Sequence, residues 1–171
     1  MGPWYTGPVS PEVHVLSCSD VHNFLTENGV PHEIVQLPRR SPTAVKAANL
    51  LGVPVAEVVK SLLFMVDDAP VMVLMPGDRS ADEERVRLAV GGTSCVLARP
   101  KQVLDVTGYR VGAVPPCGLA RATRLLADQR VFDAAVVYCG GGTDTTMLKI
   151  RSDDLRAVLA PEIGDLAAAP E

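Results

Sequence analysis

The segment 58–66, which reads VVKSLLFMV, limits the fold more than any other part of the chain. It is an apolar run rich in valine and leucine, and a second apolar run, VMVLM, follows at residues 71–75. Residues 67–70 between them are Asp, Asp, Ala and Pro, a composition typical of a turn. Two such runs joined by a short turn predict a β-hairpin, whose strands are antiparallel. We therefore expect a sheet that contains antiparallel pairs.

Helical patterns alternate with further strand patterns along the rest of the chain. We expect helices at residues 20–28, 42–51, 82–90, 100–107 and 152–159, with Ser19, Ser41 and Ser152 as N-caps of the first, second and last. Further strands are expected at residues 32–37, 94–98, 123–126, 134–139 and 145–150. Because strands and helices are interspersed and hairpins are present, the predicted class is α+β, with a mixed, largely antiparallel twisted sheet flanked by helices.

The length of the chain predicts a single domain. Its 171 residues, 47% of them apolar, suffice for one core that buries roughly two-thirds of the unfolded surface. We expect an extended or disordered lead-in at residues 1–18, the domain at residues 19–163 and a tail at residues 164–171. No run reaches the roughly 18 apolar residues of a membrane span, and no secretory signal opens the chain. These observations predict a cytoplasmic protein that binds no membrane.

The cysteines predict neither a disulfide framework nor a metal site. The chain has four, at positions 18, 95, 117 and 139, and none forms a CxxC pair. All three histidines lie near the N-terminus, so ligands at the usual zinc spacings are lacking. We expect four reduced thiols and no metal.

Charge is unevenly distributed along the chain. The net charge is −4, yet residues 39–124 hold 12 Lys and Arg against eight Asp and Glu. A basic middle segment on an acidic protein fits a local site for an anion such as a phosphate. It does not fit a protein that coats long nucleic acid, and DNA is not an expected partner.

Lys60 is the most informative single residue. Side chains alternate along a strand, so Lys60 shares a face with Val58, Leu62 and Phe64, while Ser61 lies on the other face. Both faces are mostly apolar, and burying a lysine without an anion is costly. One interpretation is a lysine whose ammonium reaches water near the strand end. The other is an ammonium that faces a pocket for a phosphate or an ester oxygen.

Two glycine-containing segments can form backbone walls. Residues 112–118 read GAVPPCG, a loop whose prolines stiffen the chain and whose glycines permit close approach of a ligand. Its N–H groups can act as oxyanion donors, or it is an ordinary rigid surface turn. Residues 140–142 are three glycines between two expected strands, and they lack the spacing of nucleotide-binding loops. They are either a hairpin turn or a backbone wall beside a substrate.

The order of these motifs resembles one family. The segments VVKSLLF (58–64), LMPGDR (74–79), TGYRVGAVPPCG (107–118) and VYCGGG (137–142) follow one another as in the YbaK/ProX-like family, the prolyl-tRNA synthetase-associated editing domain. The resemblance covers roughly residues 20–160. It implies a deacylase that hydrolyses the ester of a mischarged aminoacyl-tRNA in trans, carrying a small amino acid such as Cys, Ala or Pro.

The resemblance also implies the roles of individual residues. Lys60 matches the lysine that holds the ribose–phosphate end of the acceptor adenosine, and Gly112 begins the loop that positions the ester carbonyl. The glycines at 140–142 match the wall of the amino-acid pocket, although some relatives carry a serine in place of Gly140. The implied catalytic residues are Lys60 and Gly112. The implied substrate contacts are Ser61, Val114, Pro115, Pro116, Cys117, Gly118, Gly140, Gly141 and Gly142.

The resemblance further implies that the reaction needs no cofactor. The implied partners are the acceptor end of an aminoacyl-tRNA, with Arg39, Arg40 and Lys46 as candidate contacts to the rest of the tRNA, and an aminoacyl-tRNA synthetase. Two other hypotheses stay open. The same pocket can belong to a non-catalytic module that binds an aminoacylated end, a nucleotide or a synthetase. A thiol function through Cys117 is the third, although the sequence offers no nearby histidine to activate it.

Overall fold

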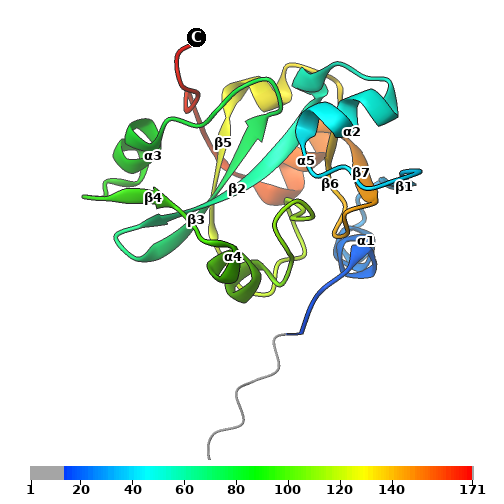
Figure 1. The fold of residues 1–171 in the computed structure, drawn as a ribbon, viewed down its shortest axis with the longest axis horizontal. Helices are drawn as coiled ribbons and strands as arrows, with labels where there is room; N and C mark the ends of the chain where they lie inside the picture. Colours follow the sequence, from blue (N-terminus) through cyan, green and yellow to red (C-terminus); the bar gives the residue numbers. More distant parts are fainter. Residues whose placement is uncertain (1–13, 171) are drawn as a thin grey trace, which may run out of the picture.

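The computed structural model describes residues 14–170 and shows one mixed sheet flanked by helices (Figure 1). The expected lead-in at residues 1–13 lies outside the described residues. The strands are β1 (Glu33–Gln36), β2 (Val58–Val66), β3 (Ala69–Pro76), β4 (Cys95–Leu97), β5 (Arg124–Asp128), β6 (Val136–Gly140), β7 (Thr146–Arg151) and β8 (Glu162–Gly164). The helices are α1 (Cys18–Glu27), α2 (Ala44–Leu51), α3 (Glu83–Val90), α4 (Pro100–Thr107) and α5 (Ser152–Leu159), with 3₁₀ turns η1 (Val55–Glu57) and η2 (Gln129–Phe132).

The sheet has the order β1-β7-β6-β2-β3-β5-β8, with β4 paired to β2 outside this path. The pairs β1–β7, β6–β7, β2–β3 and β2–β4 are antiparallel. The pairs β2–β6, β3–β5 and β5–β8 are parallel. The predicted α+β class with a mixed sheet is therefore confirmed.

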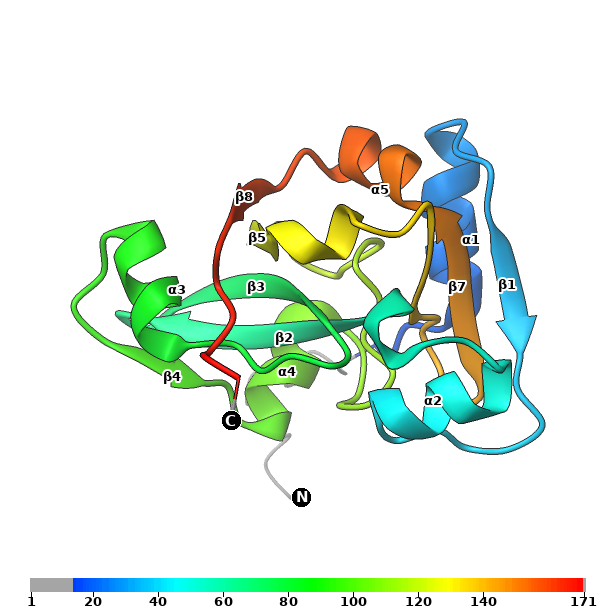
Figure 2. The same ribbon diagram turned by 90° about the horizontal axis from the view of Figure 1, so that it is seen from above.

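The two faces of the central hairpin are buried in different clusters. Val59 and Leu63 of β2 pack in the cluster that also contains Val21 of α1 and Val103 of α4. Phe64 and Val66 pack on the opposite face with Val86 of α3 and with Leu166 and Ala167, which follow β8. Figure 2 shows this last segment of the chain leaving β8 and running past α3. The period-2 alternation predicted for residues 58–66 thus separates two cores.

Three predicted N-caps are wrong by one or two residues. The cap of α1 is Ser17 rather than Ser19, because the Ser17 hydroxyl accepts from the Ser19 N–H and the Asp20 carboxylate accepts from the Ser17 N–H. The cap of α2 is Thr43 rather than Ser41, since Thr43 Oγ1 accepts from the Lys46 N–H at 3.2 Å.

The last helix shows the third difference. Ser152 is its first residue rather than its cap, and its hydroxyl donates to the Ala134 carbonyl at 2.5 Å.

Strand β8 was not among the expected strands. It pairs with β5 over only three residues, too few to give a local pattern.

Candidate functional site

The central strand β2 has a gap in its pairing on one side. Strand β3 pairs with β2 along its whole length. On the other side β6 pairs only with Val58 and Val59, and β4 pairs only with residues 64–66. Within residues 14–170, no strand pairs with residues 60–63 on that side. A sheet position with unpaired backbone groups is a place where another extended group can bind.

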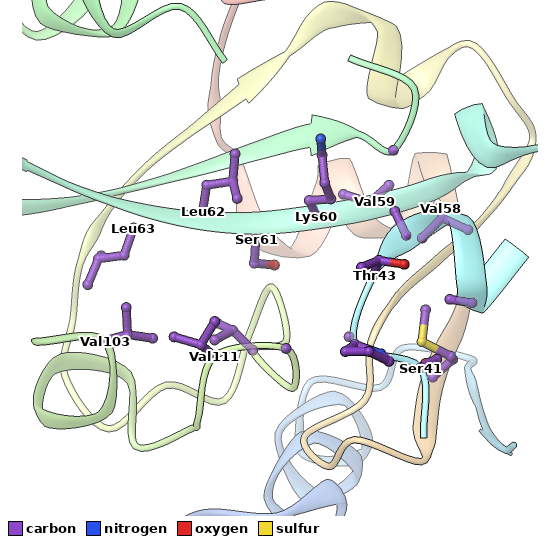
Figure 3. Close-up of a pocket in the computed structure, with 18 of the residues that line it drawn as sticks. Ser41, Thr43, Val58, Val59, Lys60, Ser61, Leu62, Leu63, Val103 and Val111 are labelled. Carbon is purple, nitrogen blue, oxygen red and sulfur yellow. The ribbon is translucent and has the colours of Figure 1, made fainter. Parts of the chain in front are cut away.

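A pocket of about 470 Å³ opens at this gap (Figure 3). Residues from seven segments meet there, although they are far apart in the sequence. They are residues 41–45 and Ala47 around the start of α2, residues 58–63 of β2, Gly77, Leu97 and Ala98, Val103 of α4, Val111, Gly112 and Val114, and Gly140 with Met147. Of the sequence-predicted site residues, the pocket therefore contains Lys60, Ser61, Gly112, Val114 and Gly140.

Lys60 lines the pocket, but its ammonium lies on the far side of β2 from the Gly112 loop. In Figure 3 Lys60 and Leu62 point to one side of the strand, and Ser61 and Leu63 point to the side of Val111. The Lys60 ammonium donates a hydrogen bond to the Arg79 carbonyl. Burial lowers the pKa of Lys60, and the negative charge of Asp78 partly opposes this effect. An ammonium has three N–H donors, and among residues 14–170 only the Arg79 carbonyl accepts from this one, so two donors are available to an anionic ligand.

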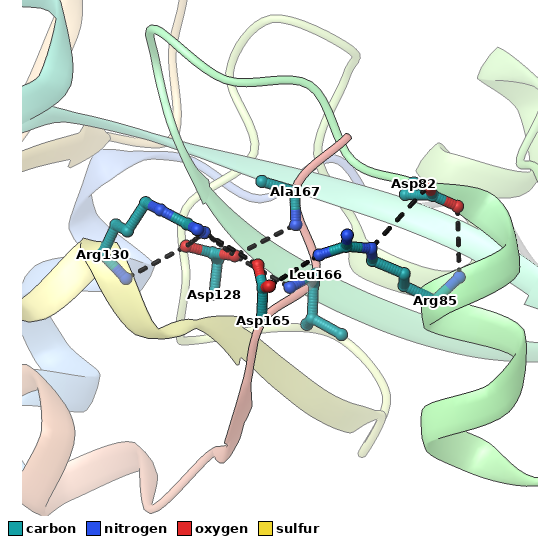
Figure 4. Close-up of polar contacts among 7 residues, drawn as sticks. All are labelled: Asp82, Arg85, Asp128, Arg130, Asp165, Leu166 and Ala167. Carbon is teal, nitrogen blue, oxygen red and sulfur yellow. Dashed lines mark hydrogen bonds and ion pairs between the residues drawn. The ribbon is translucent and has the colours of Figure 1, made fainter. Parts of the chain in front are cut away.

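The loop that carries Arg79 is held by the C-terminal segment. The Ala168 N–H donates to the Ser80 carbonyl, and the Asp82 N–H donates to the Leu166 carbonyl, each at 2.8 Å. The fully buried Asp128 carboxylate in turn accepts from the Leu166 and Ala167 N–H groups at 2.9 and 3.1 Å (Figure 4). The acceptor of Lys60 is therefore supported by residues close to the end of the chain.

Ser61 occupies the side of β2 that faces Val111. Its hydroxyl oxygen is buried and has no hydrogen-bond partner among the described residues. An unsatisfied buried hydroxyl costs roughly 1–3 kcal/mol. Folded proteins contain few such orphaned polar atoms, and a ligand or a water that completes the hydrogen bonding is one explanation for them.

The two glycine segments are docked on each other through their backbones. The Gly142 N–H donates to the Ala113 carbonyl at 3.0 Å. A Cβ on Gly140 would lie 2.2 Å from the Val114 carbonyl oxygen, so only glycine permits this approach. Gly112 has a φ of +90°, a conformation that favours glycine. The close approach places Gly112, Val114 and Gly140 together at the pocket.

The rest of the GAVPPCG loop does not line the pocket. Pro115, Pro116 and Cys117 are buried, and the Gly118 carbonyl accepts from the Tyr109 hydroxyl at 2.8 Å. Burial raises the pKa of the Cys117 thiol to about 12, so it is a poor nucleophile near neutral pH. This environment gives no support to a thiol function at Cys117.

The two remaining glycines also lie outside the pocket. The Gly141 N–H donates to the Thr146 carbonyl at 3.1 Å. A Cβ on Gly142 would lie 2.8 Å from the backbone of Ser17 and Cys18, which begin α1. These glycines close the turn between β6 and β7 against α1, which agrees with the turn interpretation.

Sequence reasoning missed one wall of the pocket. Residues 41–45, at the start of α2, lie beside residues 58–63, and the positive end of the helix dipole favours a negatively charged group there. The Ser41-Pro42 pair marks the start of a helix, but nothing local shows which strand that helix faces. Arg40, a candidate tRNA contact, pairs with Asp144 at 2.9 Å.

Residues 14–170 contain neither a metal-ligand cluster nor a membrane-spanning helix. No cluster of three or more His, Cys, Asp and Glu side chains in this part of the chain has the arrangement of a metal site. Among the same residues, no helix combines the length and apolarity needed to cross a membrane.

Comparisons with known proteins agree on one kind of domain. Residues 39–158 match the model of the aminoacyl-tRNA editing domain. The proline–tRNA ligase of Nitratidesulfovibrio vulgaris (strain Hildenborough) is 36% identical over 109 residues, which are 63% of this chain and 19% of the ligase. That of Listeria welshimeri is 31% identical over 96 residues, 56% of this chain and 17% of the ligase. The chain thus spans about a fifth of the length of these curated relatives.

Solved structures give a likeness over nearly the whole length. The crystal structure of a protein proposed to be a trans-editing enzyme for prolyl-tRNA synthetase has a TM-score of 0.83 and 27% identity, covering 89% of this chain and 97% of that one. A hypothetical protein of known structure has the same TM-score and identity, covering 87% of this chain and 99% of that one. The editing-domain model matches well over half of the sequence, and the expected resemblance is confirmed. This chain belongs to the aminoacyl-tRNA editing domain family.

Proposed function

We propose that this protein is an aminoacyl-tRNA deacylase that acts in trans. It adds water to the ester of a mischarged tRNA, breaks the bond between the acyl carbon and the ribose oxygen, and releases a free amino acid and the tRNA. One observation carries the proposal, namely the pocket that joins Lys60, Gly112 and Gly140 at the gap beside β2. The related protein of nearly equal length that is proposed to be a trans-editing enzyme supports action without a fused synthetase.

The pocket supplies positioning and backbone polar groups. An aminoacyl ester is already activated, so orientation and one or two hydrogen-bond donors lower the barrier substantially. In this proposal the backbone at Gly112 positions the ester carbonyl, and a water or the neighbouring ribose hydroxyl attacks it. A single oxyanion donor is worth about 3 kcal/mol in enzymes that use one.

Lys60 supplies the positive charge. Lys60 lines the pocket, and its ammonium lies on the side of β2 away from Val111, where the Arg79 carbonyl is its one acceptor among residues 14–170. A phosphate or ribose oxygen of the terminal adenosine would use its two free donors, and an anion there would raise the lowered pKa of Lys60. The start of α2 lines the same pocket, and the positive end of its helix dipole favours negative charge on that wall.

The walls of the pocket favour a small, weakly polar amino acid. Val59, Leu63, Val103, Val114 and Met147 line it, and they offer no charged partner to a side chain. The volume of about 470 Å³ must hold part of the terminal nucleotide as well as the aminoacyl group. Cysteine, alanine and proline fit these limits, so their esters are the proposed substrates.

Exposed apolar side chains surround the pocket. Val45 of α2, Leu97 of β4 and Val111 are each more than half exposed, and all three belong to the lining residues. Unpaired bases at the single-stranded acceptor end are recognised largely through stacking and apolar contact. This rim therefore suits the end of a tRNA better than it suits a free amino acid.

Single-turnover hydrolysis tests the proposal. The protein in excess is mixed with tRNA carrying Cys, Ala, Pro or Ser, and ester loss is compared with the uncatalysed rate. We expect at least one ester to be hydrolysed, and Lys60→Ala to slow that reaction about 10–100-fold through loss of a charge-assisted hydrogen bond. Lys149→Ala on β7, outside the pocket, is the matched control and keeps the wild-type rate. Binding of all four tRNAs without hydrolysis would contradict the proposal and favour a binding module.

A further inference from the structure

The hydrogen bonds of β2 show which backbone N–H and C=O groups face β3 and which face the gap. The Gly77 N–H donates to the Val58 carbonyl, so the backbone groups of Val58 face β3. In an antiparallel ladder the N–H and C=O of one residue point to the same side, and the side alternates along the strand. Ser61 and Leu63 therefore face away from β3, and the Ala98 N–H bonded to the Leu63 carbonyl at 2.9 Å agrees with this.

Ser61 is consequently the residue whose N–H and C=O both face the gap. Pairing with β6 ends at Val59 and pairing with β4 starts at Phe64, and within residues 14–170 no backbone group bonds to Ser61 on this side. Ser61 also lines the pocket. A donor and an acceptor are thus available side by side on the pocket wall.

The length of the gap limits the size of the group that can bind in it. The four residues between the β6 pairs and the β4 pairs span roughly 13 Å at about 3.3 Å per residue, and at one end the Leu63 carbonyl already accepts from the Ala98 N–H. An extended peptide needs an open strand edge, whereas a single residue fits between two neighbouring strands. The geometry points to one aminoacyl group as the occupant.

We infer that the aminoacyl group pairs with Ser61 as one residue of an antiparallel strand would. In a hydrogen-bonded pair, two residues exchange both backbone bonds. The aminoacyl ester carries the same N–Cα–C=O unit, so its α-ammonium donates to the Ser61 carbonyl and its ester carbonyl accepts from the Ser61 N–H. The second bond polarises the carbonyl that is attacked. This inference rests on the proposed function and adds that the substrate must carry a free amino group on the α-carbon.

Three non-hydrolysable probes test this selectivity. They are 3′-amino-3′-deoxyadenosine carrying an alanyl, a β-alanyl or a propionyl group through an amide. The alanyl probe has the nitrogen on the α-carbon, the β-alanyl probe has it one carbon further, and the propionyl probe lacks it. We expect the alanyl probe to bind at least tenfold more tightly than the other two. We also expect it to shift the Ser61 amide resonance in ¹⁵N–¹H spectra by more than the propionyl probe does.

A variant separates backbone recognition from side-chain recognition. In Ser61→Ala the preference for alanyl over propionyl persists, because the backbone groups are unchanged. Loss of the preference in Ser61→Ala would assign recognition to the hydroxyl and overturn the inference. Equal affinity of the three probes would also overturn it, while leaving the proposed function intact if aminoacyl-tRNA is still hydrolysed. If no probe binds and no ester is hydrolysed, the proposed function fails and the inference fails with it.

Discussion

Replacing Gly140 by alanine tests whether the contact between the two glycine segments shapes the pocket. An added Cβ would lie 2.2 Å from the oxygen and 2.9 Å from the carbon of the Val114 carbonyl. Ordinary contacts to a Cβ begin near 3.4 Å, so the backbone must shift by about an ångström. Both contacting atoms belong to the backbone, and side-chain rotation cannot relieve the overlap. Overpacking of this kind costs roughly 1–3 kcal/mol, and we expect a value at the upper end.

Two readouts follow from this displacement. At about 2–4 °C per kcal/mol for a protein of this size, the Tm should fall by roughly 4–12 °C. The shift moves Gly112 relative to β2, and a misplacement of about 1 Å can slow a reaction about 100-fold. Gly164→Ala is the matched control, because the nearest atom to its Cβ, Leu166 Cδ2, is 3.9 Å away. A Gly140→Ala protein with wild-type Tm and wild-type deacylation rate would refute the reasoning.

Three further outcomes are expected. Asp128→Ala should lower the free energy of unfolding by about 3–5 kcal/mol in urea titrations, because it orphans the Leu166 and Ala167 N–H groups, and a loss under 1 kcal/mol would contradict this role. Burial lowers the pKa of Lys60, so the unfolded state binds more protons than the folded state just below pH 10.5. The free energy of unfolding of the wild type, relative to Lys60→Met, should therefore rise with pH through that window. A fall would contradict the lowered pKa. Iodoacetamide should modify buried Cys117 only after unfolding, as mass spectrometry of native and denatured protein can show.

The sequence predicted the bounds of those elements that are defined by residues within and directly beside them. The bounds of β2 and α4 coincide with the expected residues 58–66 and 100–107. The first is a long apolar run closed by a turn, and the second begins at a proline and ends before Gly108 in a left-handed conformation. In both segments propensity, patterning and turn chemistry agree.

The candidate site depended on contacts that no local pattern contains. The alternation along β2 placed Lys60 and Ser61 on opposite faces, but the acceptor of Lys60 is the Arg79 carbonyl, 19 residues away. The gap beside β2 arises because β6, 78 residues further on, pairs with only its first two residues. The stiffness of the proline pair was evident from the sequence, whereas its burial was not, because the flanking Val114 and Cys117 enter a core cluster built from distant segments.

A crystal structure of the protein with the alanyl amide of 3′-amino-3′-deoxyadenosine tests the central claim most directly. We expect the aminoacyl group in the gap between β6 and β4, with its carbonyl at the Ser61 N–H and near Gly112, and its ribose on the side of Lys60. A probe bound elsewhere on the surface, or a gap that stays empty at saturating probe, would contradict the proposed binding of the aminoacyl group beside β2.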